Sequence, residues 1–224
     1  MSGKSMSTTP GMTMPGGWTM SMAWMRMPGQ TWQAAAASFL NMWIVMTLAM
    51  MLPALVPMLR RCRRPVVAGI GYLLVWSLVG AAVFAAGAAL AALEMRQTAM
   101  ARAVPLAGGV IVLLAGLFQF TRWKARGLAR CRRTLRHTEQ TCHELSSDFG
   151  AVWRHGLRLG LLCTGCCANL MAVLLVIGVM DLRAMTIVTA AVSLERLAPA
   201  GQRLARATGA VIAAAGAVLI ARAI

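Results

Sequence analysis

The sequence predicts an all-α fold, a polytopic integral membrane bundle of about six transmembrane helices. Of its 224 residues, 59% are hydrophobic and only six are Asp or Glu. The mean hydropathy of +0.69 is too high for a soluble domain of this length. The 22 Lys and Arg residues give a net charge of +16. They bracket apolar runs, so they indicate membrane orientation and not nucleic-acid binding.

Six apolar runs are the expected spans: residues 38–59, 66–93, 104–120, 157–180, 184–198 and 207–221. Arg60 and Arg61 close the first run, so the positive-inside rule places that end in the cytoplasm and the N-terminus outside. The basic segment 122–156 is expected in the cytoplasm as a solvated or headgroup-binding loop. The chain therefore divides into an N-terminal segment, residues 1–37, and a helical bundle, residues 38–221.

The N-terminal segment is rich in Met, interleaved with Gly, Pro, Thr and Trp, and shows no regular period. Thioethers persist where thiols oxidise, so a methionine-rich tail outside the cytoplasm suits the capture of Cu(I). Its Trp residues equally suit an interfacial segment among lipid headgroups. The two roles are compatible.

Sulfur gathers in the fourth expected span. At 3.6 residues per turn Cys163, Cys167 and Met171 share one helix face, and Cys166 flanks it. Soft sulfur ligands favour Cu(I). Zn(II) is the weaker alternative, because its sites usually include nitrogen or oxygen ligands or four thiolates. The alternative to metal binding is that Cys serves here as a small buried apolar residue.

The first expected span carries a second set of sulfur atoms, with Met42, Met46 and Met50 four residues apart and Met51 adjacent. Such a stripe by itself is also typical of helix packing. Met50 and Met51 lie at a depth comparable with the Cys cluster, so the two sets meet if the helices touch. The candidate metal ligands are Cys163, Cys166, Cys167, Met171, Met42, Met46, Met50 and Met51.

Other polar residues carry weaker signals. The basic segment carries a sparse set of Cys and His residues whose spacing matches no standard zinc module, namely Cys131, His137, Cys142 and His143. In the fifth span Glu195 is expected to pair with an Arg or to face the bundle interior. Arg196 is expected to extend toward the cytoplasm.

Two of these stretches resemble the DUF2182 family of bacterial membrane proteins. The first is Asn41-Met42-Trp43-Ile44-Val45-Met46-Thr47-Leu48-Ala49-Met50-Met51-Leu52-Pro53 with Pro57-Met58, and the second is Cys163-Thr164-Gly165-Cys166-Cys167 with Leu170-Met171 and Glu195-Arg196-Leu197. The resemblance implies a metal-binding protein of the bacterial inner membrane and supplies no reaction. The chain departs from the family pattern at Ala168, where members usually carry Trp. It also has Cys131 alone where members have a pair of Cys.

The sequence thus favours a copper-handling membrane protein, for transport or for delivery to a copper-dependent membrane or periplasmic protein, as a single chain, an oligomer or part of a larger complex. One alternative is a structural or assembly subunit. Another is an enzyme, a thiol oxidoreductase that uses Cys163 and Cys166. No Cys falls in a predicted outer loop, so its relay to exported substrates is incomplete, and we assign no catalytic residue.

Overall fold

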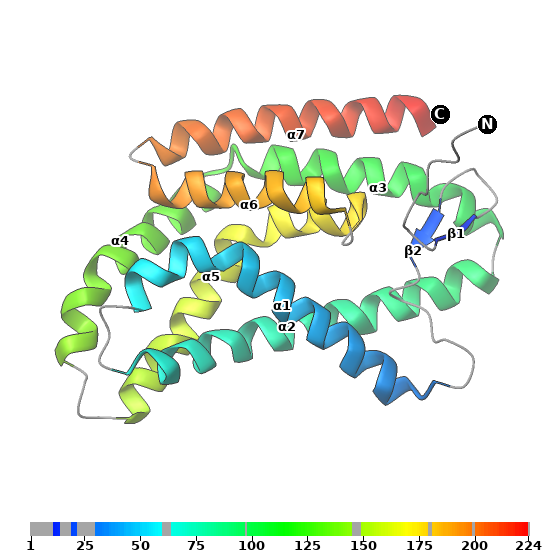
Figure 1. The fold of residues 1–224 in the computed structure, drawn as a ribbon. Coiled ribbons are helices and arrows are strands. Elements are labelled where there is room, and N and C mark those ends of the chain that lie inside the picture. Colours follow the sequence, from blue (N-terminus) through cyan, green and yellow to red (C-terminus); the bar gives the residue numbers. More distant parts are fainter. Residues whose placement is uncertain are drawn as a thin grey trace, which may run out of the picture.

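The computed structural model describes residues 11–13, 19–21, 30–59, 64–96, 98–144, 149–178, 181–198 and 200–223 (Figure 1). Within them, two short strands precede seven helices. Strands β1 (Gly11–Thr13) and β2 (Thr19–Ser21) pair in antiparallel register, with Met12 opposite Met20. The methionine-rich segment therefore contains a short strand pair, which no sequence period indicated. A strand pair of three residues each tolerates the Gly and Pro residues on either side that exclude a helix.

The helices are α1 (Trp32–Leu59), α2 (Pro65–Arg96), α3 (Thr98–Phe118), α4 (Arg122–Glu144), α5 (Phe149–Ile177), α6 (Leu182–Leu197) and α7 (Gly201–Ala223). Six of them overlap the six expected spans. Four, namely α1, α2, α5 and α7, are long and apolar enough to cross a membrane, and α3 with α4 forms a bent pair that gives a fifth if it counts as one span. The count of six spans and the outward N-terminus stay predictions.

Helix α4 corrects the prediction of a basic loop. Its buried residues Lys124, Leu128 and Cys131 recur at helical spacing on one face, and this face packs against α5 and α6. The chain bends by 64° between α3 and α4, so α4 turns back toward the bundle and does not run out into solvent.

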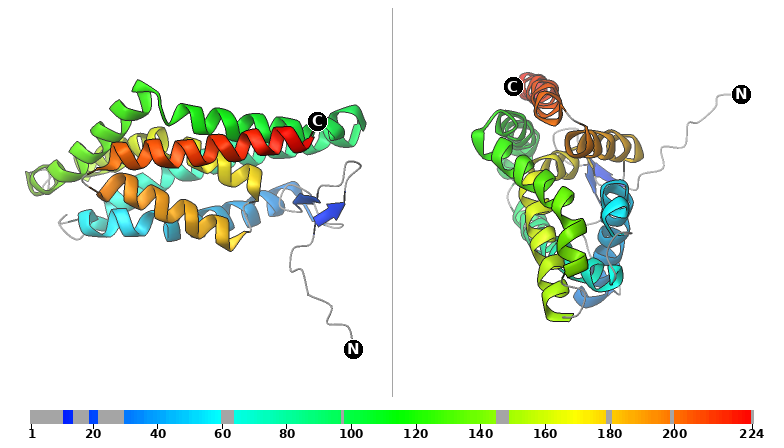
Figure 2. Two further views of the ribbon diagram at one scale, coloured as in Figure 1. Left: turned by 90° about the horizontal axis from the view of Figure 1, so that it is seen from above. Right: turned by 90° about the vertical axis from the view of Figure 1, so that its left-hand side faces the viewer.

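Two helix pairs form the frame of the bundle: α3 with α7, and α2 with α5. Both views of Figure 2 show α7 (red) lying along α3 (green). Glycine permits the close approach of α3 and α7, because a Cβ atom on Gly116 would lie 2.5 Å from the backbone nitrogen of Ala213. Helix α1 packs on α2, where the indole of Trp43 donates a 3.0 Å hydrogen bond to the carbonyl of Trp76.

The apolar core that surrounds the sulfur atoms lies between α1, α2, α5 and α6, with Cys131 added from α4. Asp181 caps α6 by accepting hydrogen bonds from the backbone nitrogens of Arg183 and Ala184. This cap fixes the start of a short helix that ends in two buried charged residues, Glu195 and Arg196.

We predict that Gly116→Ala lowers the free energy of unfolding by about 1–3 kcal/mol, because the added methyl group meets α7 backbone that cannot move aside. The matched control is Gly69→Ala in α2, where a Cβ atom meets nothing within 4 Å. There the same change should stabilise the helix by roughly 0.5–1 kcal/mol. Denaturant unfolding in detergent micelles measures both, and equal effects would show that α3 and α7 are not packed this closely.

Candidate metal centre

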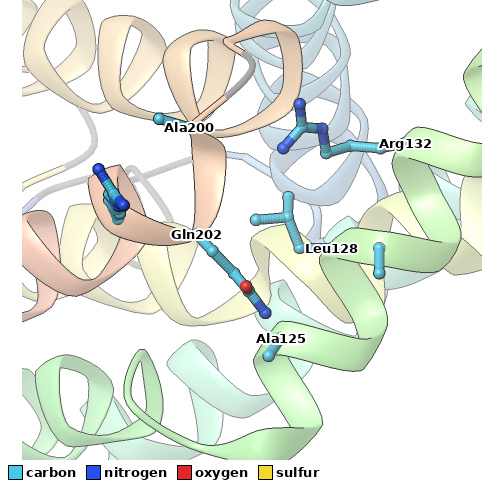
Figure 3. Close-up of a pocket in the computed structure, with 7 residues that line it drawn as sticks. Ala125, Leu128, Arg132, Ala200 and Gln202 are labelled. Atoms are coloured by element: carbon cyan, nitrogen blue, oxygen red, sulfur yellow. The ribbon is translucent and has the colours of Figure 1, made fainter.

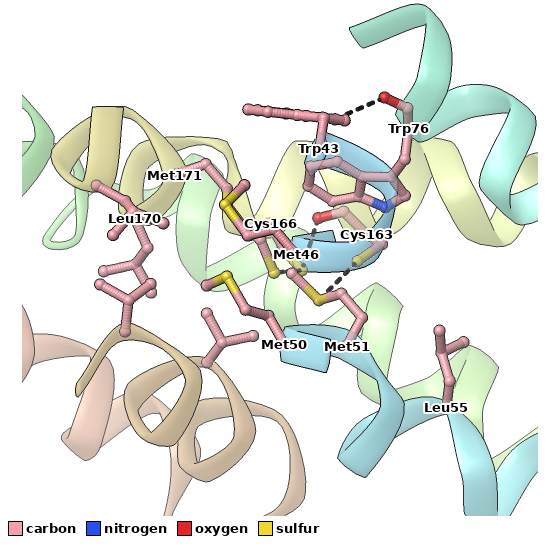
Figure 4. Close-up of a cluster of buried hydrophobic side chains, with 14 of the residues drawn as sticks. Trp43, Met46, Met50, Met51, Leu55, Trp76, Cys163, Cys166, Leu170 and Met171 are labelled. Carbon is pink, nitrogen blue, oxygen red and sulfur yellow. Dashed lines mark hydrogen bonds between the residues drawn. The ribbon is translucent and has the colours of Figure 1, made fainter. Parts of the chain in front are cut away.

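The sulfur atoms of α1 and α5 meet in the buried core, as expected if the two helices touch. The thiol of Cys163 lies 3.8 Å from the thioether sulfur of Met51, and both side chains are completely buried. Figure 4 shows Met46, Met50 and Met51 of α1 (blue) facing Cys163 and Cys166 of α5 (yellow). Residues more than a hundred positions apart in the sequence therefore form one sulfur cluster.

The side chain of Cys163, on α5, contacts residues of α1 and α2, so three helices meet at this thiol. Besides Met51 of α1, its sulfur lies 3.0 Å from the hydroxyl oxygen of Tyr72 in α2. Tyr72 is itself buried. A hydroxyl at this distance from the sulfur orients the thiol and is able to donate a hydrogen bond to a thiolate.

Cys166 and Cys167 are neighbours in space as well as in sequence, with their sulfur atoms 3.5 Å apart. The Cys166 thiol also donates to the carbonyl of Cys163 at 3.3 Å. Cys131 of α4 is buried in the same core as these thiols. We call Met46, Met50, Met51, Cys131, Cys163, Cys166, Cys167 and Met171 the sulfur cluster.

All but one of the candidate ligands predicted from the sequence belong to this cluster. Met46, Met50, Met51 and Met171 are buried with the thiols. Met42 is half-buried and packs against the edge of the cluster. The structure thus brings together both predicted sulfur sets, and their role as metal ligands stays a prediction.

Cys131 is the member of the cluster that the sequence placed elsewhere, in a cytoplasmic loop. The spacing of Lys124, Leu128 and Cys131 carried the helical signal, but the basic composition of the segment obscured it. The side chains of His137, Cys142 and His143, which the sequence grouped with Cys131, lie outside the described part of the chain.

Arg196 lies against the sulfur cluster. Its guanidinium nitrogens are 2.9 Å from the sulfur of Cys131 and 3.9 Å from that of Met51, and only 5% of the residue is exposed. The prediction that Arg196 extends toward the cytoplasm is therefore wrong. The bend between α3 and α4 places Cys131 beside the end of α6. Cys131 therefore covers the guanidinium of Arg196 on the side where it would otherwise reach the surface of the bundle.

Glu195, next in the sequence, faces the interior and pairs with a lysine and not with an arginine. Its carboxylate lies 2.9 Å from the ammonium group of Lys124 and accepts a 2.9 Å hydrogen bond from Gln119. Lys124 also donates to the carbonyl of Cys166 at 2.6 Å and to the side-chain oxygen of Asn169 at 3.3 Å. This buried network connects α4 directly to the backbone of the cysteine motif.

A cavity of about 330 Å³ lies apart from the sulfur atoms (Figure 3). It is bounded by α4 and the start of α7, with Leu128, Arg132, Gln202 and Arg203 in its wall. No Cys or Met lines it. The sulfur cluster is therefore a packed site, not an open pocket.

The donor set of the cluster suits a soft ion. Among the residues that the structure describes, no three His, Cys, Asp or Glu side chains are arranged to hold one metal ion. The closest sulfur contact between α1 and α5 instead joins a thiol to a thioether, a combination that favours Cu(I) over metals bound by nitrogen and oxygen.

The comparisons with known proteins agree with this chemistry. A family model described as PpoB2, copper chaperone, matches residues 40–219. The matched segment includes every residue of the sulfur cluster and also Arg196. Neither a curated protein nor a solved structure gives a match.

We predict that Lys124→Met lowers the free energy of unfolding by about 3–5 kcal/mol, because it leaves the buried Glu195 carboxylate without its counter-charge. The double variant Lys124→Met with Glu195→Gln should regain most of this loss, since no buried charge is then uncompensated. Unfolding in detergent measures both. Additive losses in the double variant would show that the two charges do not interact.

Proposed function

Because this chain belongs to the PpoB2 copper chaperone family, we propose that it is an integral membrane protein that binds Cu(I) in the sulfur cluster and delivers it to a copper-dependent protein. The ion is cargo here and not a resident cofactor. The observation that carries the proposal is the buried contact of 3.8 Å between the sulfur atoms of Cys163 and Met51. It joins the two sulfur-bearing helices at a point closed to water.

The chemistry of the site supports copper over harder ions. Thiolate and thioether are soft ligands, whereas the described buried carboxylate, Glu195, is held by Lys124 and Gln119. Zn(II) remains the weaker alternative, because its structural sites use four strong ligands in tetrahedral geometry. The thioethers of Met50 and Met51 supply donors without charge, which suits an ion that must later be released.

We further propose a location and a direction of access. Residues 1–37 form a methionine-rich segment outside the cytoplasm, and residues 38–221 form a bundle of about six spans in the bacterial inner membrane. Four helices long and apolar enough to cross a bilayer support this assignment. Methionines of the N-terminal segment capture the ion, and those of α1 lead it to the thiols. The recipient is a membrane or periplasmic copper protein.

The DUF2182 resemblance fits the same proposal. It rests on the methionine run of α1, the cysteine motif of α5 and Glu195-Arg196-Leu197 of α6. These residues lie within the segment that the copper chaperone model matches. We propose that both describe one group of proteins and that the sulfur cluster is their shared site.

The test is the Cu(I) content of the detergent-purified protein, loaded under anaerobic conditions. The background is a chain in which Cys62 and Cys142 are replaced by Ser, so that the remaining thiols are those of the cluster. This protein should bind near-stoichiometric Cu(I). Cys163→Ser should weaken binding by more than about a hundredfold, since even the loss of a residue that only orients a metal ligand costs about ten- to hundredfold in affinity.

A matched pair of variants tests the contribution of the methionines to copper binding. Met51→Leu removes the thioether that faces Cys163, while Met185→Leu makes the same change in α6 at the edge of the core. Met51→Leu should weaken Cu(I) binding and Met185→Leu should not. Equal, negligible copper in all proteins would overturn the proposal and favour a structural or assembly subunit, whereas copper-free protein with a disulfide between Cys163 and Cys166 would favour a thiol oxidoreductase.

A further inference from the structure

Two neighbouring cavities between α4 and the start of α7 are lined by basic residues. The larger, of about 330 Å³, shares Ala125, Leu128 and Gln202 with a smaller one of about 60 Å³ (Figure 3). The basic residues in the two walls are Arg122, Lys124, Arg132, Arg203 and Arg206. Lys124 is neutralised by Glu195, and no described carboxylate lines either cavity. The walls therefore carry a net positive charge.

The start of α7 makes this charge suitable for binding a phosphate group. Helix α7 begins at Gly201 and is 23 residues long, so the positive end of its dipole lies beside the larger cavity. Arg203 in its first turn and Arg206 one turn later have exposed side chains, and neither forms an ion pair within the described residues. Guanidinium groups bind phosphate oxygens through paired hydrogen bonds.

A buried acceptor in the smaller cavity indicates a second group on the ligand. Gln119 lines this cavity, and only 3% of the residue is exposed. Its amide nitrogen donates to Glu195, and because a carboxylate only accepts, the oxygen of Gln119 faces away from Glu195. This oxygen, Oε1, is buried and has no hydrogen-bond partner among the described residues. A buried acceptor without a donor is costly, so a ligand that carries a hydroxyl group beside its phosphate fits this site.

The cavities lie where the surface of the bundle changes character. Helices α3 and α7 lie side by side (Figure 2), and further along both of them expose apolar side chains such as Leu114 and Val211. At the cavities this apolar surface gives way to the arginines and to two exposed aromatic residues, Phe120 and Trp123. A change from apolar to aromatic and basic side chains is typical of the membrane interface, the level of the lipid headgroups.

We propose that the two cavities bind the headgroup of an anionic glycerophospholipid of the phosphatidylglycerol class. Arg203 and Arg206 hold the phosphodiester, and a glycerol hydroxyl donates to Oε1 of Gln119. The acyl chains lie outside the cavities, along the exposed apolar surface of α3 and α7. This inference goes beyond the proposed function: it shares with it the membrane location and does not involve the copper cargo.

Other headgroups fit the walls less well. The ammonium group of phosphatidylethanolamine is repelled by the arginines, and phosphatidylcholine is neutral overall and has no donor for Gln119. Soluble phosphates, such as glycerol 3-phosphate, carry the same charged group and hydroxyls. They lack acyl chains and gain nothing from the apolar surface beside the cavities.

The experiment measures lipid binding by native mass spectrometry on the metal-free full chain in detergent. The probes are phosphatidylglycerol, phosphatidylethanol and phosphatidylcholine with the same acyl chains. Phosphatidylglycerol should bind at least about tenfold more tightly than phosphatidylcholine, because basic side chains attract an anionic headgroup. Phosphatidylethanol keeps the charged phosphodiester and lacks the glycerol hydroxyls. It should bind about two- to tenfold more weakly than phosphatidylglycerol, the effect of one hydrogen bond.

Variants of exposed arginines on α7 locate the site. Arg203→Gln and Arg206→Gln should each weaken phosphatidylglycerol binding roughly fivefold, the order expected for one basic side chain beside an anionic lipid. The matched control is Arg222→Gln, which removes an exposed arginine at the other end of the same helix and should change nothing.

A second pair of variants fills the cavities without altering charge. Ala125→Leu places an apolar side chain in the space that both cavities share, and Ala210→Leu makes the same change at an exposed position of α7. Ala125→Leu should weaken phosphatidylglycerol binding and Ala210→Leu should not. Helix content by circular dichroism and elution volume check the fold of each variant.

Three results would overturn the proposal. Equal binding of phosphatidylglycerol and phosphatidylcholine would show that the cavities do not select an anion. Unchanged binding in Arg203→Gln, Arg206→Gln and Ala125→Leu would place the lipid elsewhere. Displacement of the lipid by millimolar glycerol 3-phosphate or inorganic phosphate would show a site for a soluble anion. Because the protein is metal-free in these assays, failure of copper binding would leave the lipid result intact, and the reverse also holds.

Discussion

The constraint on which the structure depends is the neutralisation of charge inside an apolar bundle. Two cations, Lys124 and Arg196, are buried where water cannot solvate them. Lys124 is balanced by Glu195, whereas the guanidinium of Arg196 contacts the sulfur atoms of Cys131 and Met51. Because Lys124 and Cys131 both come from α4, the bend that turns this helix back onto α5 and α6 is what completes both arrangements. Without α4, Glu195 and Arg196 would be left without these partners at the end of α6.

The sequence predicted which sulfur-bearing side chains share a helix face, because helical periodicity is a local property. The spacing of Met46, Met50, Cys163 and Cys167 assigns each residue to a helix face, and the apolar faces of neighbouring helices pack together. The helix boundaries were predicted less closely, since α1, α3 and α5 begin several residues before their apolar runs. There Trp, Gln, Thr and Arg continue the helix beyond the hydrophobic segment.

The errors of prediction share a cause. A basic, polar segment is predicted to be solvated when each charge is considered without its partner. Lys124 is buried because it pairs with Glu195, which lies 71 residues further along the chain. The same holds for Arg196, whose direction is decided by Cys131 from α4. Tyr72, which contacts Cys163, gave no signal of its own in the sequence. Partners contributed by distant helices are set by tertiary packing, and no single-residue pattern specifies them.

The assembly of the cluster from distant helices has a consequence for the proposed binding of copper. Its sulfur atoms come from α1, α4 and α5, so the complete donor set exists only in the folded bundle. An ion that binds this state and not the unfolded chain stabilises the bundle by mass action, and it links the helices that supply its ligands. Release then requires that one of these helices moves. Helix α4 has two polar links to α6, Lys124 to Glu195 and Cys131 to Arg196, and both lie beside the sulfur cluster. Helix α4 therefore supplies partners for the buried charged residues and also covers the sulfur cluster.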